Sequence, residues 1–381
     1  MGWYAKDRAR ERIARLAGQG LDLVTFWREC TDALAPAVPH YLAPCWFTVD
    51  PASLLVTSHF QEGLPEMPGE WLAAEYFEDD FNKMSDVARS ESGVATLHEA
   101  TGGDPARSPR YGRAMVPYGA EQELIAGLRT RSGEVWGALG LYREPGRPRF
   151  DDDEIALIRA ITPSLAEGAR RGLLVGEATE PDGPDMPGLI VLRGDWSVES
   201  MTPGVERWLD AFPDGDHSRG ELPSSVYAVA GQALRTADGA DAPGEVAVAR
   251  VLARTGRWIV LHGASLVWNG ERRSAVIVEP AHPARISPLL MAAYGLTARE
   301  QDVTRLVLQG SSTAQISQTL SIAAETVQQH LKNVFEKTGV RSRRDLVGKV
   351  FFAHYEPRLR DNERREKVGR PARGGPVELA G

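Results

Sequence analysis

The strongest constraint on the fold is a set of helix-start signals between residues 296 and 347. A Ser or Thr three residues before an acidic or amide side chain begins a helix, because the two residues satisfy each other's free backbone N–H groups. The pairs are Thr297 with Glu300, Ser312 with Gln315, and Ser342 with Asp345. Gly310 and Gly339 can end the first and third helices in a left-handed turn. The spacing predicts four short helices, of which the second and third form a helix-turn-helix unit.

These residues closely resemble the LuxR/GerE-type helix-turn-helix of bacterial transcription regulators. The matching positions are Leu296, Thr297, Arg299, Glu300, Gly310, Ile316, Leu320, Ile322, Thr326, Val327, His330, Leu331, Lys337, Gly339, Val340, Ser342 and Arg343. The resemblance implies an all-α four-helix domain over residues 290–354. It also implies that this domain binds double-stranded DNA as a homodimer.

In such a domain the third helix enters the major groove and turns Val327, Leu331 and Val334 inward. The positions from which the family reads bases are occupied by Gln328, Gln329 and Lys332. Gln can pair with adenine, and Lys can reach guanine. Phosphate contacts are expected from Thr326, Asn333, Lys337, Arg341, Arg343 and Arg344. His330 is expected to pack at the helix edge or to meet a phosphate rather than to titrate or bind metal.

Two departures from the family pattern affect this domain. Ala323 replaces the usual Ser cap before the third helix, at a cost of about 1 kcal/mol of local stability. Segment 324–337 carries two Lys and two Glu, so its net charge is zero. Attraction to phosphates must therefore come mainly from the arginines at 341–344 and from the tail, which predicts a moderate salt dependence and a need for dimerisation.

Charge is unevenly distributed along the 381 residues, whose net charge is −8. Residues 285–381 carry 16 Lys and Arg against 10 Asp and Glu, a balance of +6, and the remainder has a balance of −14. An acidic body with a basic C-terminal end suits a chain in which only that end meets a polyanion. Residues 355–381 are expected to be a basic flexible tail.

The N-terminal part predicts mixed α and β structure. Strands are expected at 45–49, 54–57, 121–130 and 134–142, and a long helix begins at Asp151–Glu154, whose carboxylates suit a helix N-terminus. After a Pro-rich linker at 176–187, further strands are expected at 189–192, 197–201, 246–254, 257–268 and 274–279, with helices near 203–212 and 224–236. The fold class is multidomain α+β. Residues 1–175 resemble a GAF-like domain and residues 188–281 a PAS-like domain, which implies two sensor modules.

Three other classes fit the body less well. A phosphorylated receiver domain lacks its lysine, because Lys6 and Lys83 are the only lysines before residue 332. A quorum-sensing ligand domain would use an aromatic-plus-Asp pocket, which Trp71, Tyr76, Asp79 and Asp80 resemble at poor spacing. No hydrolase, zinc-protease or phosphate-loop motif occurs, so no catalytic residue, cofactor or metal site is predicted.

The compartment follows from what the sequence does not contain. Cys30 and Cys45 cannot form a disulfide framework, and no apolar run is long enough for a membrane span. The sequence therefore predicts a cytoplasmic, non-enzymatic transcription regulator. It is expected to bind DNA as a dimer, through helix 151–175 or the C-terminal helix, and to be controlled by a ligand or partner. A ligand-independent protein-interaction module that its C-terminal domain localises to DNA is the alternative.

Overall fold

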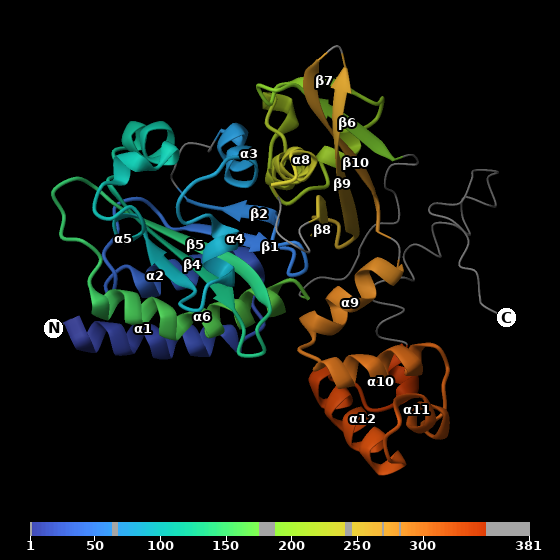
Figure 1. Ribbon diagram of the computed structural model, residues 1–381. Coiled ribbons are helices and arrows are strands. Elements are labelled where there is room, and N and C mark those ends of the chain that lie inside the picture. The colour runs from blue at the N-terminus through green and yellow to red at the C-terminus, as the bar shows by residue number, and fades with distance from the viewer. Residues whose placement is uncertain are drawn as a thin grey trace. The chain divides into compact units, whose positions relative to one another are not determined.

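The structure is a computed structural model that describes residues 2–62, 68–174, 187–240, 246–268, 270–281 and 283–347. The chain forms two compact units: one holds two five-stranded sheets, and the other holds the C-terminal helices (Figure 1). Each unit is described by itself. The predicted tail and almost all of the predicted linker lie outside the described residues.

The first module is an antiparallel sheet in the order β2-β1-β5-β4-β3. Its strands are β1 (Cys45–Val49), β2 (Val56–Phe60), β3 (Val94–Thr96), β4 (Gln122–Arg129) and β5 (Val135–Arg143). The strands expected at 45–49 and 54–57 are present and pair antiparallel, although the second begins two residues later than expected. Leu54 accounts for the shift, because it adopts a left-handed φ of 60° and donates its N–H to the carbonyl of Asp50.

Helices pack on this sheet and complete the first module. They are α1 (Gly2–Ala17), α2 (Leu23–Leu34), α3 (Gly69–Phe77), α4 (Met84–Arg89), α5 (Leu97–Ala100) and α6 (Asp152–Gly172), with short helices η1 (Pro105–Arg107), η2 (Tyr111–Met115) and η3 (Val116–Tyr118). Helices α1 and α6 lie side by side on one face (Figure 1). Asp151 and Glu154 form the capping box of α6, so those carboxylates start a helix as predicted. The three short helices all lie between residues 102 and 118.

The second module repeats the connectivity of the first, with strand order β7-β6-β10-β9-β8. Its elements are β6 (Gly188–Leu192), β7 (Val198–Met201), α7 (Glu206–Leu209), η4 (His217–Arg219), α8 (Ser224–Ala237), β8 (Val248–Leu252), β9 (Trp258–Trp268) and β10 (Glu271–Pro280). All five predicted strands are present. Their apolar side chains, with Trp208 and Phe212, continue the core of the first module.

The two sheet modules meet through α3 and α8, which lie side by side in Figure 1. A Cβ on Gly231 of α8 would lie 2.4 Å from the carbonyl oxygen of Ala73 on α3, so only glycine permits this approach. Asp50, after β1, also receives the guanidinium of Arg250 on β8 at 2.6 and 2.7 Å. Asp50 is 2% exposed, so this pair is a buried link between the modules.

The C-terminal unit contains α9 (Pro283–Ala293), α10 (Ala298–Leu308), α11 (Thr313–Leu320) and α12 (Ala324–Thr338), and residues 343–347 begin a further helical turn. The capping boxes of Thr297 and Ser312 are formed as predicted, and Gly339 ends α12 with φ 67°. Helix α9 was not predicted. It contributes Met291 to a small core that includes Leu296, Val303, Ile316 and Leu346. None of the helices described here is long and apolar enough to cross a membrane.

Candidate DNA interface and interior cavity

The turn between α11 and α12 fixes the orientation of α12. Ser321 ends α11 in a left-handed conformation with φ 53°, and the hydroxyl of Ser317 donates to the carbonyl of Ile322 at 2.5 Å. Ala323, as N-cap of α12, makes no side-chain capping bond. Val327, Leu331 and Val334 of α12 are buried, so its inward face is the one that the sequence predicts.

The outward face of α12 brings together the residues predicted to read bases. Gln328, Gln329 and Lys332 are all exposed, and so is Thr326. Gln329 donates through Nε2 to Oδ1 of Asn333 at 3.0 Å, which orients its amide. Three donors or acceptors suited to base edges therefore project from two turns of one helix.

Two residues predicted to contact phosphates, the exposed Lys337 and the half-buried Arg343, also bind partners within the domain. The ammonium of Lys337 lies 2.6 Å from Oε2 of Glu300, a carboxylate that is 3% exposed. Arg343 donates to the carbonyl of Ser311 at 2.9 Å and to Oγ1 of Thr313 at 2.8 Å, so it ties the last turn to the start of α11. Both side chains thus have a structural role whether or not DNA is bound.

The remaining predicted residues are free of such contacts or lie at the helix edge. Arg341 and Arg344 are exposed beyond the end of α12, where a DNA backbone could reach them. His330 is half-buried, in agreement with packing at the edge of the helix. Among the described residues, the exposed cations of this surface are therefore Lys332, Lys337, Arg341 and Arg344, of which Lys337 is paired with Glu300.

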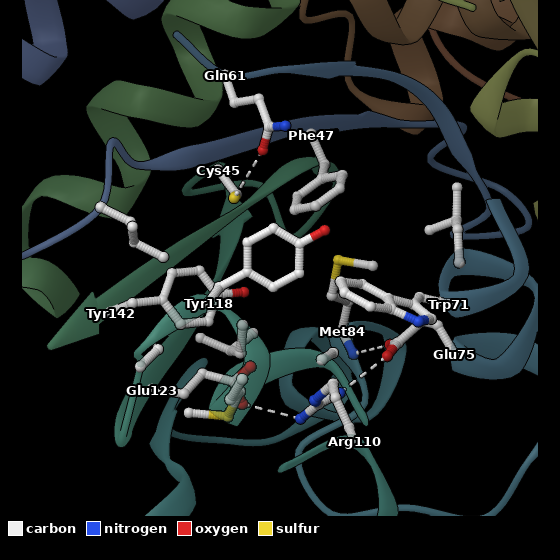
Figure 2. A pocket seen from close by; sticks show the side chains of 16 residues that line it. Cys45, Phe47, Gln61, Trp71, Glu75, Met84, Arg110, Tyr118, Glu123 and Tyr142 are labelled. Carbon is white, nitrogen blue, oxygen red and sulfur yellow. Dashed lines mark hydrogen bonds and ion pairs between the residues drawn. The ribbon is translucent and has the colours of Figure 1, made fainter. Parts of the chain in front are cut away.

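A second candidate site is a cavity of about 100 Å³ inside the first module, between α3, the sheet and the η2–η3 segment (Figure 2). Most of its walls are apolar or aromatic, from residues such as Phe47, Trp71 and Ile125. Its polar floor is formed by Glu75, Arg110 and Glu123. Figure 2 shows the guanidinium of Arg110 between the two carboxylates.

Burial controls the electrostatics of this floor. Arg110 donates to Oε2 of Glu75 at 3.0 Å and to Oε2 of Glu123 at 2.8 Å, and the exposed fractions of the two acidic side chains are 7% and 1%. Desolvation raises the pKa of Glu75 to about 7, although Arg110 opposes this shift. Desolvation also raises the pKa of Glu123. One guanidinium therefore does not fully compensate two carboxylates.

The four residues considered for an aromatic-plus-Asp pocket do not assemble into one. Trp71 lines the cavity, but Tyr76 binds the backbone of Val56 and Leu54 through its hydroxyl. Asp79 pairs with Arg235 of the second module, and Asp80 accepts from the backbone N–H of Arg110. Sequence reasoning missed the actual floor, because Glu75, Arg110 and Glu123 come from three separate segments.

Comparison with known proteins identifies the C-terminal domain. Its geometry is that of a helix-turn-helix DNA-binding domain, and residues 295–350 match the family model GerE, "Bacterial regulatory proteins, luxR family". The "Monoamine regulon transcriptional regulator" of Klebsiella aerogenes is 39% identical over 57 residues, which are 15% of this chain and 25% of that protein. The chain thus spans about a quarter of that relative. Residues 295–350 therefore form a LuxR-type helix-turn-helix domain. This assignment supports a role in DNA-binding transcriptional regulation.

Two solved structures are weakly similar to this chain. The VqsR LBD domain from Pseudomonas aeruginosa is 23% identical, with a TM-score of 0.32, and the match covers 44% of this chain and 97% of that one. The DhaR(N)-DhaL complex of E. coli is 10% identical, with a TM-score of 0.22, and that match covers 72% and 88% of the two chains. These likenesses do not assign the two sheet modules, whose GAF-like and PAS-like character stays a prediction.

Proposed function

We propose that this protein is a sequence-specific, DNA-binding transcription regulator that acts as a dimer and is controlled by a ligand in its first module. The single observation that carries the DNA-binding part is the exposed face of α12 with Gln328, Gln329 and Lys332, in a domain that matches the LuxR family. Two such helices in a dimer would contact half-sites about one DNA turn apart.

Ligand control is supported by the cavity and by the position of α3. This helix lines the cavity with Trp71 and Glu75, and its Ala73 lies against Gly231 of α8 in the second module. A ligand that moves α3 would therefore change the packing of the second module. Helix α6 packs against α1 and against the same sheet. A change in this module would therefore also be transmitted through α6 to a dimer contact. The alternative, a ligand-independent interaction module, predicts no co-purified small molecule in native mass spectrometry.

The DNA-binding proposal is tested by substituting Gln329 and Lys332 together with Ala. Sites are first found by genome-wide mapping of bound DNA, and footprints on one site are then compared for the wild type and the variant. Each base contact is worth about 1–3 kcal/mol, so we expect the specific footprint to disappear while the fold and weak non-specific binding persist.

A matched control is Arg305→Ala with Gln309→Ala, which removes one cation and one glutamine from exposed positions at the end of α10. This control is expected to keep the footprint. An unchanged footprint for the α12 variant would refute the assignment of the reading face. A monomer at the concentration that protects the site, measured by light scattering, would refute the dimer.

A further inference from the structure

The cavity of the first module holds an excess of negative charge, and this excess indicates what it binds. The inference rests on the proposed ligand control of this module. Near the floor, Asp80 accepts from the backbone N–H of Arg110, and the ammonium of Lys83 is bound to the carbonyls of Tyr76 and Glu78. Lys83 acts on Glu75 and Asp80 acts on Glu123. With these two outer charges counted, three carboxylates lie near two cations, Arg110 and Lys83, so one negative charge is left uncompensated.

Acceptors without partners point into the same space. Both oxygens of Glu75 are occupied, by Arg110 and by the backbone N–H of Met84. Glu123 uses only Oε2, and among the described residues neither its Oε1 nor the hydroxyl of Tyr142 makes a hydrogen bond. A carboxylate 99% removed from solvent strongly favours a donor beside its free oxygen. Figure 2 shows Glu123 and Tyr142 on the same side of the cavity.

The opposite wall is aromatic. The rings of Trp71 and Tyr118 meet edge to face with their centroids 5.3 Å apart, and Phe47 lines the same space. Aromatic faces attract cations, and the surrounding Met84, Met115 and Ile125 suit an apolar body. Nε of Arg110 is a buried donor without a hydrogen-bond partner among the described residues, but an anionic ligand that accepted from it would lie beside both glutamates, which disfavours an anion.

We propose that this cavity binds a small organic cation, a protonated amine with a compact apolar body, whose ammonium lies between Glu123, Tyr142 and the aromatic wall. The volume limits the ligand to a body smaller than benzene, since a cavity of about 150 Å³ is known to hold benzene and this one has about 100 Å³. The ammonium group of the ligand neutralises the excess negative charge of the two glutamates, which a bound proton would otherwise neutralise. Binding is therefore expected to strengthen as the pH rises through about 7, where Glu75 loses its proton.

The test uses three small probes of similar shape: isopropylamine, isopropanol and isobutyrate. Their binding to the full chain is measured by isothermal calorimetry at pH 8. We expect the amine to bind at least tenfold more tightly than the alcohol and the carboxylate not to bind. Equal affinities for the three probes, a preference for the carboxylate, or no binding of any probe would overturn the proposal.

Glu123→Gln identifies the group responsible, since it removes the charge and keeps the shape. The amine is expected to lose at least tenfold in affinity, while the affinity of any neutral probe that binds changes less than twofold. Glu91→Gln, which makes the same change at an exposed position of the module, is expected to leave amine binding unaltered. An equal loss in both variants would overturn the assignment to the cavity. The far-ultraviolet circular dichroism and melting curve of each variant report whether it folds.

The proposed ligand class and the proposed ligand control of DNA binding are tested by separate measurements, so that either can be refuted without the other. Amine binding is measured without DNA, and the affinity of the chain for its mapped DNA site is then measured with and without saturating isopropylamine. Selective amine binding with unchanged DNA affinity upholds the cation site and contradicts ligand control. Loss of amine binding with an intact footprint contradicts the cation site and leaves DNA recognition standing.

Discussion

The first module and the C-terminal domain both bury glutamates, but they compensate the charge differently. Glu300 starts α10 and accepts from the backbone N–H of Thr297 at 2.8 Å and from Lys337 at 2.6 Å. Burial raises its pKa, but Lys337 and the N–H of Thr297 lower it more, so the pKa lies below its ordinary value. Glu75 and Glu123 share one cation, and their pKa values are raised.

The difference distinguishes a buried carboxylate that stabilises the fold, Glu300, from the buried carboxylates that we propose to bind a ligand, Glu75 and Glu123. A buried carboxylate with its own ammonium and a capping N–H stabilises the fold and needs no further partner. Two carboxylates that share one guanidinium carry a cost that a proton or a ligand can relieve. In the C-terminal domain, the pair of Lys337 with Glu300 links α10 to α12, and Gln328, Gln329 and Lys332 of α12 stay exposed.

The largest effect is expected for Arg110→Met. This variant leaves Glu75 and Glu123 buried without a counter-charge, which should lower the free energy of unfolding of the sheet unit by about 3–5 kcal/mol at pH 8. Tryptophan fluorescence during urea unfolding reports mainly this unit, because all nine Trp residues precede residue 280 and all but Trp258 belong to it. Adding Glu75→Gln and Glu123→Gln to the variant should restore most of the loss. An equally unstable triple variant would show that charge compensation is not the cause.

The pH dependence of the sheet unit should have a definite sign. The pKa of Glu75 in the folded chain is about 7, above its ordinary value of 4.5, so the folded state binds the proton more tightly than the unfolded state. Its contribution is full below about pH 4.5 and is lost as the pH rises through 7. For a pKa shift of this size, the loss in the free energy of unfolding is about 3 kcal/mol. The variant Glu75→Gln should not show this loss.

Urea unfolding of the wild type and Glu75→Gln at pH 5 and pH 8 measures this dependence. The groups that face Glu75 are Arg110, Lys83, Glu123 and the backbone N–H of Met84, so the pH profile belongs to the coupled cluster. Glu75→Gln is expected to be more stable than the wild type at pH 8 only. If the variant is less stable at both pH values, the carboxylate of Glu75 stabilises the fold as that of Glu300 does.

Lys337→Met tests the buried carboxylate whose charge is compensated, Glu300 of the C-terminal domain. It removes the cation from buried Glu300 and should destabilise this domain by about 2 kcal/mol, the scale of a charged hydrogen bond. If Lys337 is fully engaged in the fold, the salt dependence of DNA affinity stays unchanged, whereas Arg341→Ala lowers the slope by about one. A lower slope for Lys337→Met would restore Lys337 as a phosphate contact. Amide hydrogen exchange in α10 and α12 measures the stability.

The smallest effect is expected for Ala323→Ser, which supplies the missing N-cap of α12. The new hydroxyl can accept from the free backbone N–H groups of the first turn, so the domain should gain about 1 kcal/mol. Slower amide exchange in α12, with an unchanged footprint, is the expected result. No change in exchange would show that the first turn is already satisfied in another way.

The sequence predicted best what depends on nearby residues. The capping boxes of Thr297 and Ser312, the start of α6 at Asp151 and every strand of the two sheets except β3 were predicted from local spacing, and all of these are present. Helix α9 was missed because Pro288 interrupts its pattern. The cavity floor was missed because its three residues meet only once the strand order is known, and the pair of Asp50 with Arg250 joins positions 200 residues apart.

The most direct test of the central claim, that the glutamates of the first module are under-compensated, is a titration of side-chain carboxyls by ¹³C NMR. Glu-labelled chain is compared with Glu75→Gln and Glu300→Gln to assign the two resonances. The structure predicts that Glu75 titrates at about 7 and that Glu300 titrates below its ordinary value of 4.5. A titration of Glu75 at or below 4.5 would contradict the claim, because its charge would then be compensated as fully as that of Glu300.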